Sequence, residues 1–298
     1  MILVTGASGF VGSHVIRRLQ ESGTEVRAMV RDRSKAPAAL QEAEVVEADL
    51  IRLESLPTAV SGVNVIIHAA AITADQKEPY RGAYDQINRV GTTNLVAAAK
   101  AAGVGRLVVM SGLGTKPAPT GTYMATRWGL EQAVRESGIP FVILQPSVLF
   151  GERAEFIAAL ARLIRISPVV PLIGGGKVRF QPLWLEDLAT CLIKAIDADQ
   201  LTDKAVGLGG SEYATFKEVI ETICQVMSVR RLLVPLPLEI ARVQAAVMTA
   251  LLPHPPLTPG ALELFAFDNA THLDAVDRNF GFHPRGFREH LRAHGIAG

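Results

Sequence analysis

The chain has 298 residues, 49% of them hydrophobic, so it can bury a large core as one big domain or two modest ones. Its formal net charge of +1 argues against general nucleic-acid binding, which needs a basic face. Its two cysteines, Cys191 and Cys224, lie in apolar stretches, which predicts a reduced cytoplasmic protein with neither a disulfide framework nor a metal site.

The N-terminal segment predicts a strand, a glycine-rich turn and a helix. An apolar strand at 2–4 precedes the sequence GASGFVG, and a predicted helix follows over 13–22 until Gly23 ends it. Glycine lets an anion approach the backbone closely, and a helix start directs N–H groups and the positive end of its dipole toward that anion. We therefore predict a bound dinucleotide rather than a turn without a ligand. Its expected pyrophosphate contacts are Gly6, Ser8, Gly9, Phe10, Val11 and Gly12.

Residues 1–145 alternate predicted strands and helices. The strands are expected at 2–4, 25–30, 44–48, 63–68, 106–110 and 140–144. The helices are expected at 13–22, 52–61, 86–102 and 124–137. Most strands are continuous apolar runs, which indicates a parallel sheet covered on both faces. The predicted fold class is therefore α/β with a doubly wound parallel sheet.

After Gly151 the regular alternation of predicted strands and helices ends. The remaining elements are expected to be helices at 154–165, 187–196 (capped by Asp187), 215–227 (with a Thr215–Glu218 capping box) and 238–252, a strand at 205–208, and two short terminal helices. We predict a dinucleotide-binding domain over 1–150, to which 183–209 returns. A smaller, interleaved substrate or lid region covers 151–182 and 210–298.

The first predicted strand starts at residue 2, so we expect no leader segment, and no apolar run reaches the roughly 18 residues that a membrane-spanning helix needs. The helix over 236–252 is nevertheless apolar around much of its circumference. It either faces a membrane or a protein partner, or it is buried against the rest of the chain, and burial is the favoured interpretation. His290 and His294 could share a metal by their spacing, but we favour an exposed terminal helix.

The sequence TGASGFVG resembles the TGxxGxxG start of extended and atypical short-chain dehydrogenases/reductases. Two later segments, YMATRWGLEQAVRESGIPFVILQPSVLFG and PVVPLIGGGKVRFQPLWLEDLA, are similar to bacterial relatives of the nucleotide-binding accessory subunit of respiratory complex I. Many of these are described only as NAD-dependent epimerase/dehydratase proteins. The resemblance covers nearly the whole chain and implies a Rossmann fold. In this branch the dinucleotide is retained while the catalytic set is often eroded.

The end of the second predicted strand indicates which dinucleotide binds. NAD enzymes place a carboxylate there to accept the ribose hydroxyls, but here Val30 is followed by Arg31. A guanidinium matches a 2′-phosphate by charge and paired hydrogen bonds, so we expect NADP rather than NAD. Asp32 lies one position later, and a solvated polar loop is the alternative.

The resemblance implies further cofactor contacts. These are Asp49 and Leu50 at the adenine, Ala69 and Ala70 after the fourth strand, and Pro146 and Ser147 beside the nicotinamide. Two nearby polar residues are interpreted separately. His68 could be a satisfied core histidine, and Asn88 matches an asparagine often found in the superfamily's fourth helix.

The resemblance also implies a tyrosine and a lysine four residues apart on one helix, with a nearby hydroxyl. Tyr123 matches the tyrosine, but Arg127 stands at the lysine position. The superfamily's usual hydroxyl position is occupied here by Leu113, which has no hydroxyl. Ser111 is the nearby catalytic candidate, and hydrogen bonding to the backbone at the strand end is the favoured interpretation of it. The implied roles are a proton donor for Tyr123 and a ribose contact for Arg127.

Three functions stay open at this point. The first is an NADP-dependent oxidoreductase or isomerase acting on a small carbonyl, quinone-like or sugar-nucleotide substrate. The second is a dinucleotide-binding sensor or accessory subunit without turnover. The third, a sugar-nucleotide epimerase or dehydratase, rests on superfamily analogy. We expect a monomer or homodimer, with peripheral membrane or complex association left open.

Overall fold

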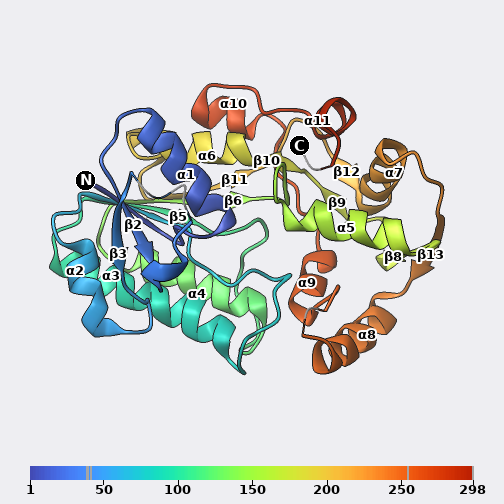
Figure 1. Cartoon of the computed structure of the whole chain (residues 1–298), viewed down its shortest axis with the longest axis horizontal. Helices are drawn as coiled ribbons and strands as arrows, with labels where there is room; N and C mark the ends of the chain where they lie inside the picture. The colour runs from blue at the N-terminus through green and yellow to red at the C-terminus, as the bar shows by residue number, and fades with distance from the viewer. Residues whose placement is uncertain (38–39, 41, 254, 297–298) are drawn as a thin grey trace. The chain divides into compact units, whose positions relative to one another are not determined.

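The computed structural model of the chain describes residues 1–37, 40, 42–253 and 255–296, and it divides into two units (Figure 1). Unit 1 comprises Met1–Ile72, Glu78–Gln145 and Ala189–Val206. Unit 2 comprises Thr73–Lys77, Pro146–Leu188 and Gly207–Gly298. Each unit is described below by itself.

The apolar runs of unit 1 form a seven-stranded sheet in the order β11-β6-β5-β4-β1-β2-β3. The strands are β1 (Ile2–Thr5), β2 (Val26–Val30), β3 (Glu44–Glu47), β4 (Val65–His68), β5 (Arg106–Met110), β6 (Phe141–Pro146) and β11 (Lys204–Leu208). The pairs from β3 through to β6 are all parallel. The strand order reverses between β1 and β4, which is the point where ligands bind in such sheets. The predicted doubly wound α/β class is confirmed.

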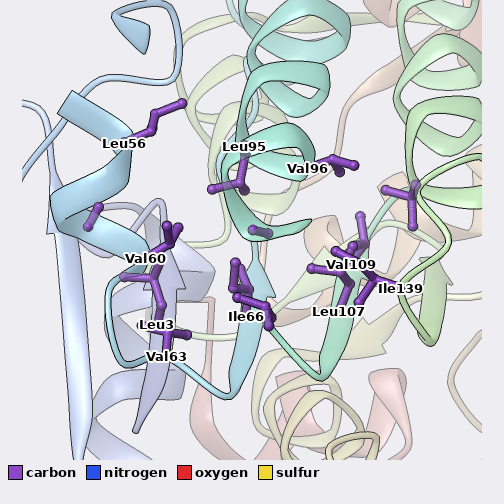
Figure 2. Packing of buried hydrophobic residues seen from close by; sticks show 14 of the residues in the cluster. Leu3, Leu56, Val60, Val63, Ile66, Leu95, Val96, Leu107, Val109 and Ile139 are labelled. Atoms are coloured by element: carbon purple, nitrogen blue, oxygen red, sulfur yellow. The ribbon is translucent and has the colours of Figure 1, made fainter. Parts of the chain in front are cut away.

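Helices cover both faces of this sheet (Figure 1). They are α1 (Phe10–Glu21), α2 (Leu56–Val60), α3 (Gly91–Ala101), α4 (Tyr123–Arg135) and α6 (Leu185–Lys194), of which α6 runs across the division between the units. Figure 2 shows Leu56 of α2 and Leu95 and Val96 of α3 in one buried cluster with strand residues such as Ile66 and Leu107. This buried cluster joins one face of the sheet to α2, α3 and α4. Helix α1 lies on the opposite face (Figure 1).

Three predicted elements of unit 1 differ from the structure. Helix α1 begins at Phe10, so half of the glycine-rich segment is already helical. The helix expected at 86–102 is a π-helix, η4 (Asp85–Val90), followed by α3. The helix expected at 52–61 is a 3-10 turn, η3 (Leu53–Ser55), followed by the short α2. Two further 3-10 turns are η1 (Arg33–Lys35) and η6 (Asp199–Leu201).

Unit 2 combines three two-stranded sheets with helices. Its strands are β7 (Leu149–Phe150), β8 (Val169–Ile173), β9 (Arg179–Phe180), β10 (Leu183–Trp184), β12 (Ala214–Thr215) and β13 (Leu232–Leu236), paired β7–β10, β9–β12 and β8–β13. Its helices are α5 (Glu155–Ile166), α7 (Phe216–Val226), α8 (Leu238–Leu251), α9 (Pro259–Glu263), α10 (Ala275–Phe280) and α11 (Phe287–His294), with 3-10 turns η5 (Gly174–Gly176) and η7 (Leu264–Ala266). An aromatic group around Phe180 lies in its core, beside Phe216 and Phe265.

Two helix-start predictions in this part of the chain have different outcomes. The capping box is confirmed, because Thr215 Oγ1 accepts from the Glu218 N–H while Glu218 accepts from the Thr215 N–H. Asp187 does not cap α6, which begins at Leu185. The Asp187 carboxylate accepts instead from the backbone N–H of Arg285, 2.7 Å away.

Helix α8 is not buried as favoured from the sequence. Only its small residues Ala241 and Ala245 are fully buried. Four large apolar side chains along it are exposed: Ile240, Val243, Val247 and Leu251. Within the described residues, every helix is too short or too polar to span a membrane. The apolar character of this segment therefore reflects an outward face of unit 2.

Arg106 links β5 to the segment after α6 within unit 1. Its Nε donates to the Ala195 carbonyl at 3.1 Å and its Nη2 to the Ala198 carbonyl at 2.7 Å. The same guanidinium pairs with Asp199 at 3.2 Å, but that carboxylate side chain is 96% exposed. Exposed ion pairs contribute little to folding stability. We therefore infer that Arg106 stabilises unit 1 mainly through its hydrogen bonds to the Ala195 and Ala198 carbonyls.

We predict that Arg106→Met lowers the free energy of unfolding by about 2–3 kcal/mol, because two buried carbonyls lose a charged donor. The matched variant Asp199→Asn should cost less than about 0.5 kcal/mol, since its side chain is solvated. Urea unfolding of both variants measures this. An equal loss in the two variants would contradict the assignment.

Candidate functional site

The turn between β1 and α1 depends on glycines for close backbone contact. Gly6 has φ +68°, and an ideal Cβ there would lie 2.8 Å from the Ala69 carbonyl oxygen. A Cβ at Gly12 would lie only 2.2 Å from the Gly6 oxygen, which also accepts from the Gly9 N–H at 2.8 Å. The motif is therefore needed to seat the start of α1 directly on the end of β1.

The start of α1 has the features of an anion site. Its N-cap is Gly9, with no side-chain cap, and its first turn contains no acidic residue. The N–H groups of Phe10, Val11 and Gly12 precede the first intrahelical bond, which runs from Ser13 to the Gly9 carbonyl. Ser8 and Gly9 are exposed beside them. Open donors and the positive end of the dipole fit the pyrophosphate of a dinucleotide.

The end of β2 presents an arginine. The Arg31 side chain is exposed immediately after Val30. Asp32 is engaged locally, because its Oδ1 accepts from the backbone N–H of Ser34 at 3.0 Å and from its hydroxyl at 2.6 Å. This turn makes Arg31 the better placed group for an anion at the strand end, and a carboxylate for ribose hydroxyls is missing from the position directly after β2.

Asp49 and Leu50 shape the turn after β3. The Asp49 Oδ1 accepts from the Ile51 N–H at 3.1 Å. Leu50 is buried, and a Cβ at Gly91 would lie 2.9 Å from the Leu50 Cβ. The Leu50 carbonyl accepts from Asn94 Nδ2 at 2.9 Å. The two residues are thus fixed against the start of α3.

His68, before Ala69 and Ala70, is a core residue. Its Nε2 lies 2.9 Å from Thr92 Oγ1, and its Nδ1 lies 2.7 Å from Thr5 Oγ1. Since the Thr92 hydroxyl donates to the Asn88 carbonyl at 2.6 Å, it must accept from His68, which places the ring proton on Nε2. Burial lowers the pKa of His68 from 6.5 to about 4. His68 therefore stays neutral and ties β1, β4 and α3 together.

Asn88 has a similar structural role. Its Oδ1 accepts from the Ile72 N–H at 2.8 Å, and its Nδ2 donates to the Ile72 carbonyl at 3.0 Å. Both bonds hold the chain that follows Ala69 and Ala70. The side chain comes from the π-helix η4, a local geometry often found at functional sites.

Tyr123 and Arg127 lie together at the start of α4. Thr122 caps this helix by accepting from the Ala125 N–H, so the helix begins at Tyr123 itself. The Arg127 Nη1 donates to the Tyr123 hydroxyl at 2.6 Å. Tyr84 packs edge-on against the Tyr123 ring at 5.4 Å between centroids. The predicted spacing of four residues thus brings a permanent cation onto the phenol.

Ser111 is bound to a residue that sequence reasoning missed. Its hydroxyl donates to Glu131 Oε1 at 2.6 Å, and its N–H donates to the Leu144 carbonyl at 2.7 Å. Glu131 is buried and also accepts from Gln145 at 2.7 Å and from Arg135 at 3.2 Å. Its position four residues after Arg127, on the same helix face, was the available signal. A catalytic role for Ser111 stays a prediction.

Pro146 and Ser147 belong to unit 2. The Ser147 hydroxyl donates to the Asn269 carbonyl at 2.7 Å and accepts from the Gln181 N–H at 3.2 Å. Its backbone N–H donates to the Leu208 carbonyl at 2.8 Å. These bonds fix the chain after β6, and a nicotinamide contact there stays a prediction.

The terminal helix α11 is not simply exposed. It buries Phe287, His290 and Leu291 on one face, at the spacing of an amphipathic helix. His290 stacks on His294 at 4.6 Å between ring centroids. A cavity of about 440 Å³ in unit 2 adjoins this pair. In the described part of the chain, no cluster of three or more His, Cys, Asp or Glu side chains is arranged to hold a metal ion.

His68 predicts a pH-dependent stability. Below pH 6.5 the unfolded chain protonates this ring while the folded chain keeps it neutral, so stability falls as pH drops toward about 4. Between pH 6.5 and about 4, this difference in His68 protonation lowers the free energy of unfolding by about 3 kcal/mol. Urea unfolding at several pH values should show that His68→Gln lacks this part of the slope, whereas His272→Gln, at an exposed position, retains it. Identical slopes in the native protein and His68→Gln would contradict the prediction.

The geometry agrees with comparisons to known proteins. The chain is 28% identical to an NAD(P)H azoreductase from Xenophilus azovorans, over 100% of this chain and 99% of that protein. It is 23% identical to the mitochondrial NADH dehydrogenase (ubiquinone) 1 alpha subcomplex subunit 9 of Arabidopsis thaliana, over 91% of this chain and 68% of that protein. The crystal structure of gox2253 is 26% identical, with a TM-score of 0.75, covering 98% of this chain and 96% of that one.

The predicted resemblance to short-chain dehydrogenases/reductases and to the complex I subunit is confirmed by these relatives. Residues 2–209, more than half of the chain, match the NAD dependent epimerase/dehydratase family. The chain therefore belongs to the NAD-dependent epimerase/dehydratase family.

Proposed function

We propose that the protein is an NADP(H)-dependent oxidoreductase or isomerase that acts on a small carbonyl, quinone-like or sugar-nucleotide substrate. The observation that carries the proposal is the 2.6 Å hydrogen bond from Arg127 Nη1 to the Tyr123 hydroxyl. The full-length similarity to a protein named as an NAD(P)H azoreductase supports reductive chemistry. A cytoplasmic location stays a prediction.

The residues present fit a dinucleotide. The cradle at Gly6 and Gly12, which added Cβ atoms would fill, would hold the pyrophosphate with the N–H groups that start α1. Arg31 would bind the 2′-phosphate, and Asp49 with Leu50 would flank the adenine. Ala69 and Ala70 would line the cofactor beyond β4. When bound, the nicotinamide would supply or accept the hydride.

In this proposal, side chains of the protein supply the proton that the reaction needs. In reduction, the Tyr123 hydroxyl gives its proton to the substrate oxygen, and the Arg127 guanidinium stabilises the phenolate that remains. Arg127 would also donate to the nicotinamide ribose. Arginine keeps its charge throughout, so it acts by electrostatics and hydrogen bonding and does not relay a proton.

A second candidate function is a non-catalytic sensor or accessory protein of a respiratory-type complex. It is favoured by the exposed apolar face of α8, where Val243 is 66% and Leu251 75% exposed. The similarity to a protein named as a subunit of NADH dehydrogenase supports it as well. A stable larger assembly in a native pull-down, without turnover of any carbonyl or quinone, would decide for this function.

We expect Tyr123→Phe to lower kcat at least about 100-fold, since it removes the proton donor, with NADPH affinity within about twofold. Tyr84→Phe is the matched control because it keeps the ring that packs on Tyr123. Steady-state NADPH oxidation over a panel of carbonyls and quinones, with calorimetry for affinity, measures both. Turnover that survives Tyr123→Phe would remove the proposed proton donor.

Arg31 is expected to set the cofactor preference. Arg31→Gln should weaken NADPH binding about tenfold and leave NADH binding unchanged, because only NADPH carries the 2′-phosphate. Arg33→Gln, two residues later and also exposed, should change neither affinity. Calorimetric titration with both cofactors tests this. An equal loss for NADPH and NADH in Arg31→Gln would place the 2′-phosphate elsewhere.

A further inference from the structure

The Arg127 guanidinium needs more room beside Tyr123 than a lysine ammonium would. A guanidinium is planar and broad, whereas a lysine ammonium is compact and sits on a single carbon. In the structure, the Arg127 head group reaches the Tyr123 hydroxyl through Nη1. A neighbouring residue must therefore leave room for the other atoms of the guanidinium.

That residue is Gly112, in the segment after β5. An ideal Cβ built on Gly112 would lie 2.7 Å from Arg127 Nη2, 2.8 Å from Cζ and 3.0 Å from Nη1. Real Cβ atoms essentially never approach heavy atoms closer than 3.0 Å. Both the central carbon and the outer nitrogen of the guanidinium thus occupy the place of a side chain at position 112.

Backbone conformation does not explain this glycine. Gly6 and Gly114 have positive φ angles, which favour glycine by themselves, but Gly112 is not among the positive-φ glycines of the described chain. The structural feature that distinguishes this position is the Arg127 guanidinium, which occupies the space of a side chain.

We propose that Gly112 is a positioning residue that makes arginine workable at position 127, by letting the guanidinium lie against the backbone and bond the Tyr123 phenol. The significance of this pair for the reaction rests on the proposed function. A methyl group at position 112 displaces a broad guanidinium but leaves room for a slender lysine. The pair Gly112 and Arg127 therefore acts as one unit.

The displaced atoms are the far end of a flexible side chain, so Gly112→Ala should fold normally. Its effect is to move the Arg127 head group away from Tyr123. The variants Gly112→Ala, Arg127→Lys and the double variant form a cycle that isolates the coupling. Gly105→Ala is the matched control, because it makes the same change where the nearest contact is Asn64 at the other end of β5.

In crystal structures without cofactor, we expect Gly112→Ala to separate the Arg127 nitrogens from the Tyr123 oxygen beyond about 3.5 Å, the limit of a hydrogen bond. Gly105→Ala should keep the bond. Gly112→Ala with the hydrogen bond intact would overturn the inference.

In calorimetric titrations with NADPH, Gly112→Ala should weaken binding about tenfold in the native background and less than about twofold in Arg127→Lys. Once a substrate is identified, Gly112→Ala should likewise lower kcat more in the native background than in Arg127→Lys. Equal losses in both backgrounds would overturn the inference. If the native protein binds no dinucleotide, the proposed function fails by itself, and the cofactor-free structures still decide the role of Gly112.

Discussion

The close approach of main chain to main chain at the β1–α1 turn is the constraint on which the rest of this structure depends. The Gly6 carbonyl oxygen would lie 2.2 Å from a Cβ at position 12, so the first turn of α1 can lie against the end of β1 only with glycine at that position. Because β1 lies between β2 and β4 in the sheet, this turn places the helix start beside the ends of both neighbouring strands. Arg31 after β2 and Ala69 after β4 therefore lie at the same edge of the sheet as the start of α1, where ligands bind in sheets of this class.

Two buried polar side chains near the strand ends, His68 and Asn88, are hydrogen-bonded within the fold. His68 bridges Thr5 and Thr92, and Asn88 holds both backbone groups of Ile72. Buried polar networks whose members all have hydrogen-bond partners rigidify the structure around them. We therefore assign His68 and Asn88 to the fold, and the proposed proton transfer rests on the pair Tyr123–Arg127.

Arginine in place of lysine changes how such a pair operates. Its charge is permanent, and its fork needs a flat space beside the phenol. The structure supplies the space at Gly112, where the outer guanidinium nitrogen would lie 2.7 Å from any Cβ. In the sequence, arginine at the lysine position looks like the loss of a catalytic motif. In the structure, that arginine fits beside Gly112, a glycine fifteen positions earlier in the chain. The exposed face of α8 is a separate feature of unit 2, and it keeps the accessory function open beside the catalytic one.

The sequence by itself determined the elements whose signals are local. Apolar runs predicted the parallel strands, the glycine spacing predicted the turn at Gly6, and Thr215 with Glu218 predicted a helix start. These signals act between residues a few positions apart, so they need no knowledge of strand order. Only the tertiary structure decided that Ser111 bonds Glu131, that Arg127 lies against Gly112, and that the large apolar residues of α8 face outward. Those outcomes depend on which distant segments the sheet order brings together, and no periodicity within one segment encodes that.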